Sequence, residues 1–261
     1  MLIDGNAYTG HWPFRDLMHN RCATRLEQMN ENGVEISVVS NLNGIFYKNT
    51  QAANRELYED IKSSRRFRDR FVPFAVINPI YSGWKDDVQA SLDNMGMKGV
   101  RIYPKYHKYE LNNPACIELV KMVRDRGYPI ALSLRMVDRR PSSWLDIKNE
   151  WALKDVVPII RAVPDAKFLI LNVANSTLLN EEETRLFQQA DLMMDTSGRN
   201  IINLGALIKT YGKEKFFFGT HAPILDYCTG LLRIESLREN EADENTKEQL
   251  RSRNIKRFLN I

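Results

Sequence analysis

The sequence predicts an α/β fold, a (β/α)8 TIM barrel in a single domain over residues 1–261. Short apolar runs of strand length recur along the chain, and a stretch with helical periodicity follows each of them. Eight such units in 261 residues match the size of one barrel domain. Because the runs are apolar on both faces, they indicate parallel strands covered by helices.

Each strand is predicted from a short apolar run bounded by turn residues. In chain order the predicted strands are Leu2–Asp4, Val34–Ser40, Phe71–Ile77, Gly99–Tyr103, Pro129–Ser133, Lys167–Asn172, Ala190–Asp195 and Lys215–Thr220. The predicted helices are Phe14–Asn30, Gln51–Arg68, Trp84–Asn94, Pro114–Arg126, Glu150–Ala162, Glu181–Gln188, Ile201–Thr210, Ile224–Glu235 and Glu244–Leu259. A doubly wound open sheet is the alternative. It is disfavoured because DGNAYTG, after the first strand, is not a G-x-G-x-x-G dinucleotide fingerprint.

Composition and charge exclude several classes of partner. The net charge is +4, and the densest basic runs, Lys62–Arg70 and Lys247–Arg257, are interleaved with acidic or apolar residues in predicted helices. We interpret them as solvated helix faces and expect no nucleic-acid partner. No apolar run approaches the ~20 residues of a membrane span, so we expect no membrane partner. The three cysteines are far apart, which suits a reducing compartment, and we expect a cytoplasmic protein.

Polar side chains gather at the predicted C-terminal ends of the strands, where TIM barrels carry their active sites. The candidate substrate-binding residues at these ends are Asn6, Tyr8, His11, Arg101, Tyr103, His107, Ser133, Arg135 and Asn172. The set is cationic, and arginine binds carboxylates well. We therefore predict a pocket for a small anionic molecule. The irregular stretch Arg135–Ile147 is a candidate mouth loop or lid.

His221 and Asp195 are the candidate catalytic residues. His221 ends the eighth strand and is predicted to act as an acid or base, while Asp195, on the adjacent seventh strand, would fix its tautomer. A purely structural His221 is the alternative. Ser133 completes a nominal Ser-His-Asp set, but it is predicted to lie far across the barrel. Arg101 has two interpretations, an anion clamp or a strut that pairs with Asp4.

Several segments, in order, resemble the amidohydrolase-related (amidohydrolase 2) family of the metal-dependent hydrolase superfamily. LIDGNAYTG resembles the family's opening Ile-Asp-x-His-x-His-x-Gly, and KFFFGTHAP resembles its closing F-G-T-D-x-P. GMKGVRIYP, RGYPIALSL, VPDAKFLILNVA and MMDTSG resemble the fourth to seventh strands, and RNIKRFLN resembles the family's last helix. The resemblance runs from residue 2 to about residue 259 and implies the same barrel.

The resemblance also implies that the family's metal ligands are substituted in this chain. Asn6, Tyr8, Ser133 and Asn172 stand at the positions of four ligand histidines, and His221 replaces the family's catalytic aspartate. Amide, phenol and hydroxyl groups are not the ligands that zinc prefers. We therefore predict no metal at these positions and no cofactor.

Three hypotheses about function stay open. The first is a metal-independent hydrolase, or a decarboxylase or other lyase, that acts on a small carboxylate-bearing substrate. The second is an inactive relative that binds a metabolite or a protein partner. The third is a hydrolase with a weak, displaced metal site made from His11, His221 and Asp195. A homo-oligomer is also open, since proteins of this family are often dimers or larger.

Overall fold

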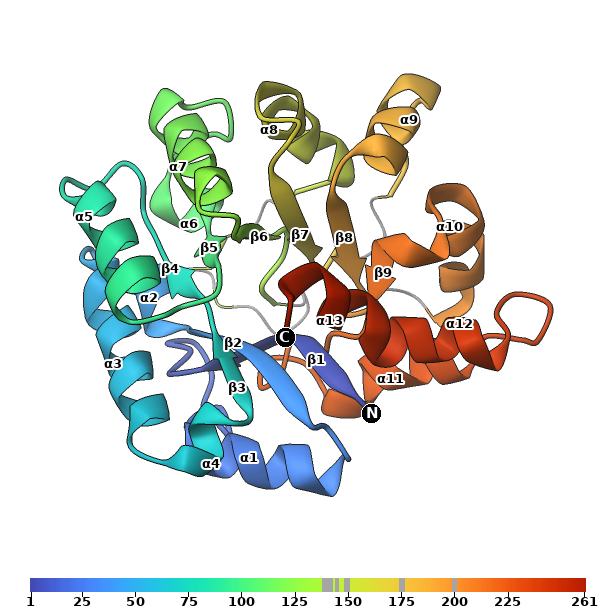
Figure 1. Cartoon of the computed structure of the whole chain (residues 1–261), viewed down its shortest axis with the longest axis horizontal. Helices are drawn as coiled ribbons and strands as arrows, with labels where there is room; N and C mark the ends of the chain where they lie inside the picture. Colours follow the sequence, from blue (N-terminus) through green and yellow to red (C-terminus); the bar gives the residue numbers. More distant parts are fainter. Residues whose placement is uncertain (138–142, 144–145, 148–150, 174–176, 199–200) are drawn as a thin grey trace.

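The predicted (β/α)8 barrel is confirmed. A computed structural model of the chain describes residues 1–137, 143, 146–147, 151–173, 177–198 and 201–261. Its strands surround a central core, and helices surround the strands (Figure 1). In the described residues the strands are β1 (Ile3–Thr9), β2 (Ile36–Asn41), β3 (Phe71–Pro73), β4 (Ala75–Val76), β5 (Val100–Ile102), β6 (Pro129–Ser133), β7 (Lys167–Leu171), β8 (Leu192–Asp195) and β9 (Phe216–Phe217).

All neighbouring strands are parallel, and the sheet closes on itself. Hydrogen bonding runs in the order β1-β2-β3 and then β4 to β9. β3 and β4 are two halves of one barrel strand, which is interrupted at Phe74. β3 pairs with β2 and β4 pairs with β5, and the Phe74 N–H between them donates to the Val39 carbonyl of β2. The last strand meets the first through Gly5 N–H to Phe218 O (2.9 Å) and His221 N–H to Asn6 O (2.7 Å). The barrel therefore has eight strand positions, and its final seam holds Asn6 beside His221.

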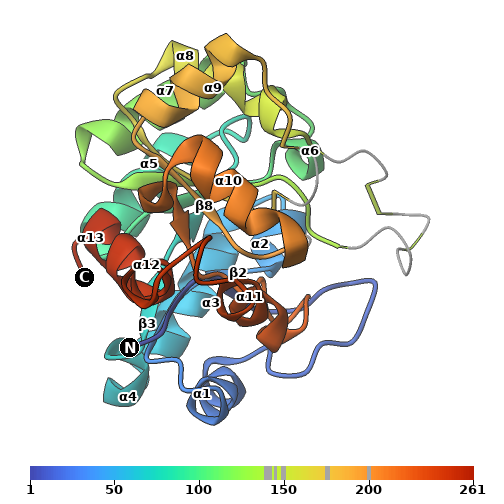
Figure 2. The ribbon, with the colours of Figure 1, turned by 90° about the vertical axis from the view of Figure 1, so that its right-hand side faces the viewer.

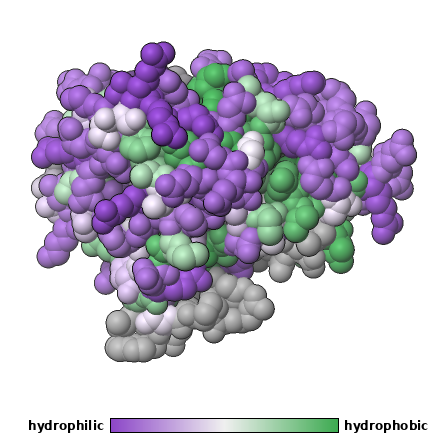
Figure 3. All heavy atoms as spheres, turned by 90° about the horizontal axis from the view of Figure 1, so that it is seen from below, coloured by the Kyte–Doolittle hydropathy of each residue, from purple (hydrophilic) through white to green (hydrophobic). Residues whose placement is uncertain are grey.

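Helices follow the strands, as the apolar periodicity predicted. They are α1 (Cys22–Glu31), α2 (Asn43–Phe46), α3 (Thr50–Lys62), α4 (Arg65–Arg68), α5 (Trp84–Gln89), α6 (Pro104–His107), α7 (Pro114–Asp125), α8 (Val157–Ala162), α9 (Glu181–Gln189), α10 (Leu204–Tyr211), α11 (Tyr227–Glu235), α12 (Glu244–Glu248) and α13 (Asn254–Leu259). None of the described helices is long and apolar enough to span a bilayer. The face in Figure 3 is mostly hydrophilic, with smaller hydrophobic areas between the polar side chains.

The centre of the barrel is filled by side chains from the strands. This interior cluster is formed mainly by Ile3, Val38, Phe74, Ala131, Leu169, Leu171, Met193 and Phe217. Two glycines make room for its rings, because a Cβ on Gly5 would lie 2.3 Å from the Phe217 ring and one on Gly99 would lie 2.5 Å from Phe74. The packed interior leaves the strand ends as the place for a site.

Several predicted elements have other bounds in the structure, and two of these differences lie close to the site. The first helix begins at Cys22 rather than Phe14, and the segment between them is irregular, with His19 in a left-handed conformation (φ 57°). Helical periodicity was too weak an indicator there, because buried Trp12 and Leu17 instead pack over the barrel mouth. The eighth strand is regular only over Phe216–Phe217, although the chain stays bonded to β1 beyond that point.

The chain termini and the candidate site lie at opposite ends of the barrel. Figure 2 shows both termini at one end and the segment that follows β1 at the other. The predicted lid, Arg135–Ile147, lies in large part outside the described residues.

Candidate functional site

Asn6 is the central residue of the site, because its amide group joins three strands. Its Nδ2 donates to Asp195 Oδ2 on β8 over 2.6 Å and lies 3.1 Å from His221 Nδ1. Its Oδ1 accepts a hydrogen bond from Arg101 Nη1 on β5 over 3.2 Å. All four side chains are fully buried. The amide thus links a buried anion, a buried cation and an imidazole.

His221 is held as a neutral imidazole. Its Nε2 lies 2.8 Å from the Met136 carbonyl oxygen, which can only accept, so Nε2 carries the proton. Its Nδ1 is then the acceptor for Asn6 and lies 3.3 Å from the Tyr8 hydroxyl. The pKa of His221 is lowered to about 3, mainly by burial and in smaller part by the nearby charges of Arg101 and Arg135. Both ring nitrogens are therefore engaged at neutral pH.

This geometry corrects the predicted His221–Asp195 pair. Asn6 lies between the two groups, so Asp195 does not fix the tautomer of the imidazole, and the Met136 carbonyl does so instead. Asp195 Oδ1 accepts the Asn172 N–H over 2.8 Å, and Oδ2 accepts the Ser197 hydroxyl over 2.6 Å. The carboxylate therefore holds the ends of β7 and β8 together. A Ser133-His221-Asp195 triad is also ruled out by these contacts.

Tyr8 lies against the other side of His221. Their rings meet edge to face, with centroids 4.9 Å apart. The Tyr8 hydroxyl is 3.1 Å from Ser133 Oγ, so Ser133 contacts the phenol rather than the imidazole. Burial raises the pKa of Tyr8, which keeps the phenol protonated at neutral pH. The Arg101 guanidinium lies over the Tyr8 ring, 4.5 Å from its centroid, as a cation–π contact.

Arg101 is a buried cation whose hydrogen-bonding capacity is only partly used. Its Nε and Nη2 make no hydrogen bond of good geometry with the described residues, but the hydroxyls of Tyr8 and of Tyr103, which follows β5, lie close enough to the guanidinium to interact with it and raise its pKa. The predicted strut to Asp4 is not formed, because Asp4 Oδ2 accepts the Thr220 hydroxyl over 2.6 Å. The guanidinium therefore has donors that a further acceptor can use.

Asn172 and Arg135 form the side of the site between β6 and β7. Asn172 has a left-handed backbone (φ 51°), and its Nδ2 donates to the Arg135 carbonyl over 2.8 Å. Arg135 Nη2 donates to Gly198 O over 3.3 Å. Gly198 is required here, because a Cβ would lie 1.6 Å from Asn172 Oδ1. The structure thus brings both predicted residues to the same rim as Asp195.

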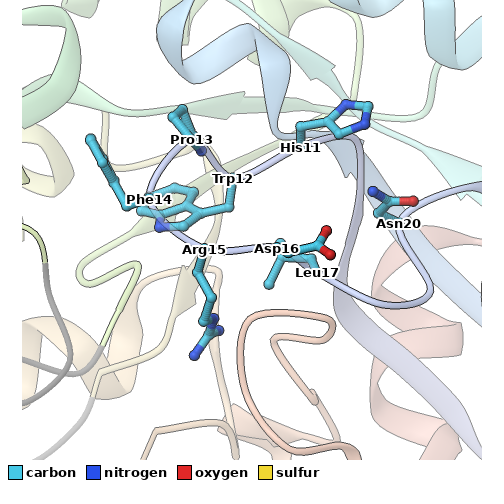
Figure 4. Close-up of a pocket in the computed structure, with 8 residues that line it drawn as sticks. All are labelled: His11, Trp12, Pro13, Phe14, Arg15, Asp16, Leu17 and Asn20. Carbon is cyan, nitrogen blue, oxygen red and sulfur yellow. The ribbon is translucent and has the colours of Figure 1, made fainter.

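His11 and His107 lie apart from this network. His11 is exposed and lines a separate cavity of about 300 Å³ with Asp16 and Asn20 (Figure 4). His107 is buried, its Nε2 lies 3.2 Å from the Gly44 carbonyl oxygen, and burial lowers its pKa to about 4. His107 therefore connects α6 to α2, so the structure favours a structural role over the predicted substrate contact.

Four aromatic side chains cover the mouth of the barrel. This ring cluster consists of Trp12, Phe14, Phe46 and Tyr106, which meet edge to face with centroid distances of 5.2–6.0 Å. It packs on the apolar group that contains Tyr8 and Tyr103. Only Phe46 exposes more than a third of its surface, at 37%. The network below the ring cluster is consequently shielded from water.

Asn6 and Tyr8, which the sequence resemblance sets at metal-ligand positions, are poor ligands for a divalent metal ion. Asn6 and Tyr8 supply an amide and a protonated phenol, and Asn6 Oδ1 already accepts a hydrogen bond from a guanidinium. A dication there would be repelled by Arg101, and the Asp195 carboxylate and the His221 imidazole are already bonded to Asn6 Nδ2. The displaced site is not formed either: within the described part of the chain no three His, Cys, Asp or Glu residues form a metal-binding group.

Sequence reasoning missed two groups that complete the site. The Met136 main-chain carbonyl fixes the imidazole tautomer, and a carbonyl leaves no trace in a sequence pattern. Arg233 on α11 donates to the Thr196 carbonyl over 3.1 Å and lies within electrostatic range of Asp195 and Arg135. Its position inside an amphipathic helix resembled that of an ordinary surface arginine, so only the tertiary structure reveals it.

The chain aligns over nearly its whole length with solved structures that share its barrel fold. It aligns with a 2,6-dihydroxybenzoate decarboxylase in complex with 2,6-dihydroxybenzoate (14% identity, TM-score 0.74, 100% of this chain and 99% of the other). It aligns with 5-carboxyvanillate decarboxylase from Sphingomonas paucimobilis (13% identity, TM-score 0.76, covering 100% of this chain and 99% of the other). It also aligns with a dihydroxybenzoic acid decarboxylase from Polaromonas sp. JS666 that holds manganese and the inhibitor 2-nitroresorcinol (13% identity, TM-score 0.72, covering 99% of this chain and 96% of the other). No protein-family model and no curated protein sequence matches the chain. At these identities the likeness shows a shared fold.

Proposed function

We propose that this protein is an amidohydrolase-related barrel that binds a small aromatic carboxylate beside Arg101 and decarboxylates it without a metal ion at the family's position. The observation that carries the proposal is the buried Arg101 guanidinium, which makes one hydrogen bond of good geometry to a described side chain, that of Asn6, and keeps further donors for a ligand. A carboxylate is the group that such a fork binds best. Aromatic carboxylates are favoured because solved barrels of the same fold are named for decarboxylating them.

Decarboxylation fits the site better than hydrolysis. Hydrolysis needs a base that activates water, and His221 is neutral, with both ring nitrogens bonded and a pKa of about 3. Loss of CO2 instead leaves the bonding electron pair on the substrate, and that negative charge needs a cation and a proton donor. Arg101 supplies the cation. Tyr8 and Tyr103 are protonated phenols beside it, and either one can donate the proton and regain it from water.

The test measures CO2 release from 2,6-dihydroxybenzoate labelled with ¹³C in the carboxyl group, with EDTA present and, separately, with added Mn²⁺. We expect release in EDTA, no stimulation by Mn²⁺, and loss of release in Arg101→Met. Arg185→Met is the matched control, because Arg185 is exposed and lies outside the site. Activity that needs Mn²⁺ and disappears in EDTA would refute metal independence.

A second candidate, ligand binding without turnover, is favoured by the fully bonded state of His221. A thermal-shift titration with the same compound separates the two functions. Stabilisation that depends on Arg101 but comes without CO2 release would establish binding alone. Absence of both release and stabilisation would remove 2,6-dihydroxybenzoate as a ligand of the site.

A further inference from the structure

A second concave site lies at the opposite end of the barrel from the candidate active site. It is a pocket of about 360 Å³, within the size range of small-molecule sites. Its lining comes from α3, α4, β3 and the segment after α5, and Figure 1 shows α3, α4 and β3 side by side. The lining residues are Tyr58, Ile61, Lys62, Arg68, Phe71, Val72, Pro73, Met95, Gly96, Lys98 and Ile261.

The floor of this pocket is apolar because it lies at the seam between two hydrophobic clusters. Val72 and Ile261 pack on the barrel interior, whereas Tyr58 and Met95 pack on the layer between strands and helices. Neither pair closes over the other. An open apolar floor of this kind is favourable for the tail of a ligand.

The rim of the pocket is cationic. Lys62, Arg68 and Lys98 are all exposed, and they outnumber the one acidic group among the lining residues, the main-chain carboxyl of Ile261. Arg68 Nη1 donates to the Lys62 carbonyl over 2.6 Å, which holds these two cations together at the end of α3. The Lys98 N–H donates to Pro73 O over 2.9 Å, which fixes the third cation at β3.

Two acidic residues near this rim in sequence are paired with arginines outside the pocket. Asp69 lies 3.5 Å from Arg65, and Asp93 lies 3.2 Å from Arg126. The three cations of the rim therefore create a positive potential above the apolar floor, and this potential attracts an anion.

We infer that this pocket binds a free amphipathic carboxylate, with its acyl tail on the apolar floor and its head group between Lys62, Arg68 and Lys98. At roughly 30 Å³ per heavy atom, by analogy with water, the cavity holds a molecule of about ten to twelve heavy atoms. Octanoate has that size. This site is separate from the one beside Arg101, so the result for either leaves the other untouched.

The experiment is a titration of the full chain, with ¹³C-labelled methionine methyl groups, by octanoate. We expect the Met95 methyl resonance to shift in a saturable way. Acetate, which has the head group alone, and 1-octanol, which has the tail alone, should bind at least tenfold more weakly. The double variant Lys62→Gln/Lys98→Gln should weaken octanoate binding about five- to tenfold. The matched control Lys48→Gln/Lys209→Gln removes the same charge from exposed positions outside the pocket and should bind octanoate like the wild type.

Several outcomes would overturn the inference. They are an unmoved Met95 resonance, equal affinity for octanoate and 1-octanol, and equal weakening in both double variants. Binding to phosphatidylglycerol vesicles without binding of free octanoate would also overturn it, because the occupant would then be a membrane surface.

Discussion

Replacement of Asn6 by alanine tests whether the amide is the centre of the buried network. The change removes hydrogen bonds to charged Asp195 and Arg101, each contributing about 1.5–3 kcal/mol, and one to neutral His221, contributing about 0.5–1.5 kcal/mol. The sum is about 3.5–7.5 kcal/mol. Because Asp195 retains other donors, we expect a loss near the lower end, about 4 kcal/mol, in the free energy of unfolding.

Urea denaturation monitored by tryptophan fluorescence measures this loss. The matched control is Asn43→Ala, which removes an amide bonded to Glu56 and to the His11 N–H at the partly exposed rim. We expect the control to cost less than about 1.5 kcal/mol. If Asn6→Ala is no more destabilising than Asn43→Ala, the network around Asn6 does not stabilise the barrel, and the argument fails.

Asn6→Asp keeps the shape of the side chain but changes its charge. The new carboxylate would stand 2.6 Å from the Asp195 carboxylate, and two such groups share a proton. The pKa of the pair in the folded state would then lie above the unfolded value of about 3.9. Folding would favour the protonated pair, so the stability of this variant relative to the wild type should fall as the pH rises from about 5 to 8. A pH-independent difference would contradict the adjacency of the two side chains.

Three further predictions follow from other buried groups. Burial raises the pKa of Asp4 to about 6, so the stability that its protonated form contributes is present at pH 4 and is lost as the pH rises through 6. The difference in unfolding free energy between wild type and Asp4→Asn should shrink by about 2–3 kcal/mol over that range. A constant difference in urea melts would refute this. Imidazole ¹⁵N spectra of His221 should show a neutral Nε2–H tautomer that does not titrate between pH 8 and 5, and a protonated ring at pH 5 would contradict the structure. Gly198→Ala should destabilise the protein by at least about 2 kcal/mol more than the control Gly96→Ala. Both glycines have positive φ, but only Gly198 is packed against Asn172. Equal melting temperatures of the two variants would count against that packing.

The fold was predictable because alternation of apolar runs and helical periods is a property of the whole chain. Strand β6 (Pro129–Ser133) was predicted to the residue, since apolar residues and turn signals coincide there. The segment from Phe14 to Cys22 was not, because its apolar residues contact the barrel mouth rather than one helix face. Local sequence cannot distinguish these two uses of an aromatic residue.

The members of the site were more predictable than their contacts. Barrel topology places strand ends together, so Asn6, Tyr8, Arg101, Asp195 and His221 were expected at one mouth, and the structure brings them together. Which atom bonds to which depends on rotamers and on main-chain carbonyls, and neither is written in a sequence. Whether these residues bind or transform a ligand stays a prediction until activity is measured.

The ring cluster has a kinetic consequence. Because the network is buried, a ligand can reach Arg101 only after side chains that cover it move apart, and among the described residues Trp12, Phe14, Phe46 and Tyr106 belong to that cover. Entry is then a first-order opening step followed by capture, so the observed association rate should reach a ceiling as ligand concentration increases. The same cover retards escape, and a bound molecule would have a long residence time even at modest affinity. The fraction of time the cover is open also scales the apparent dissociation constant.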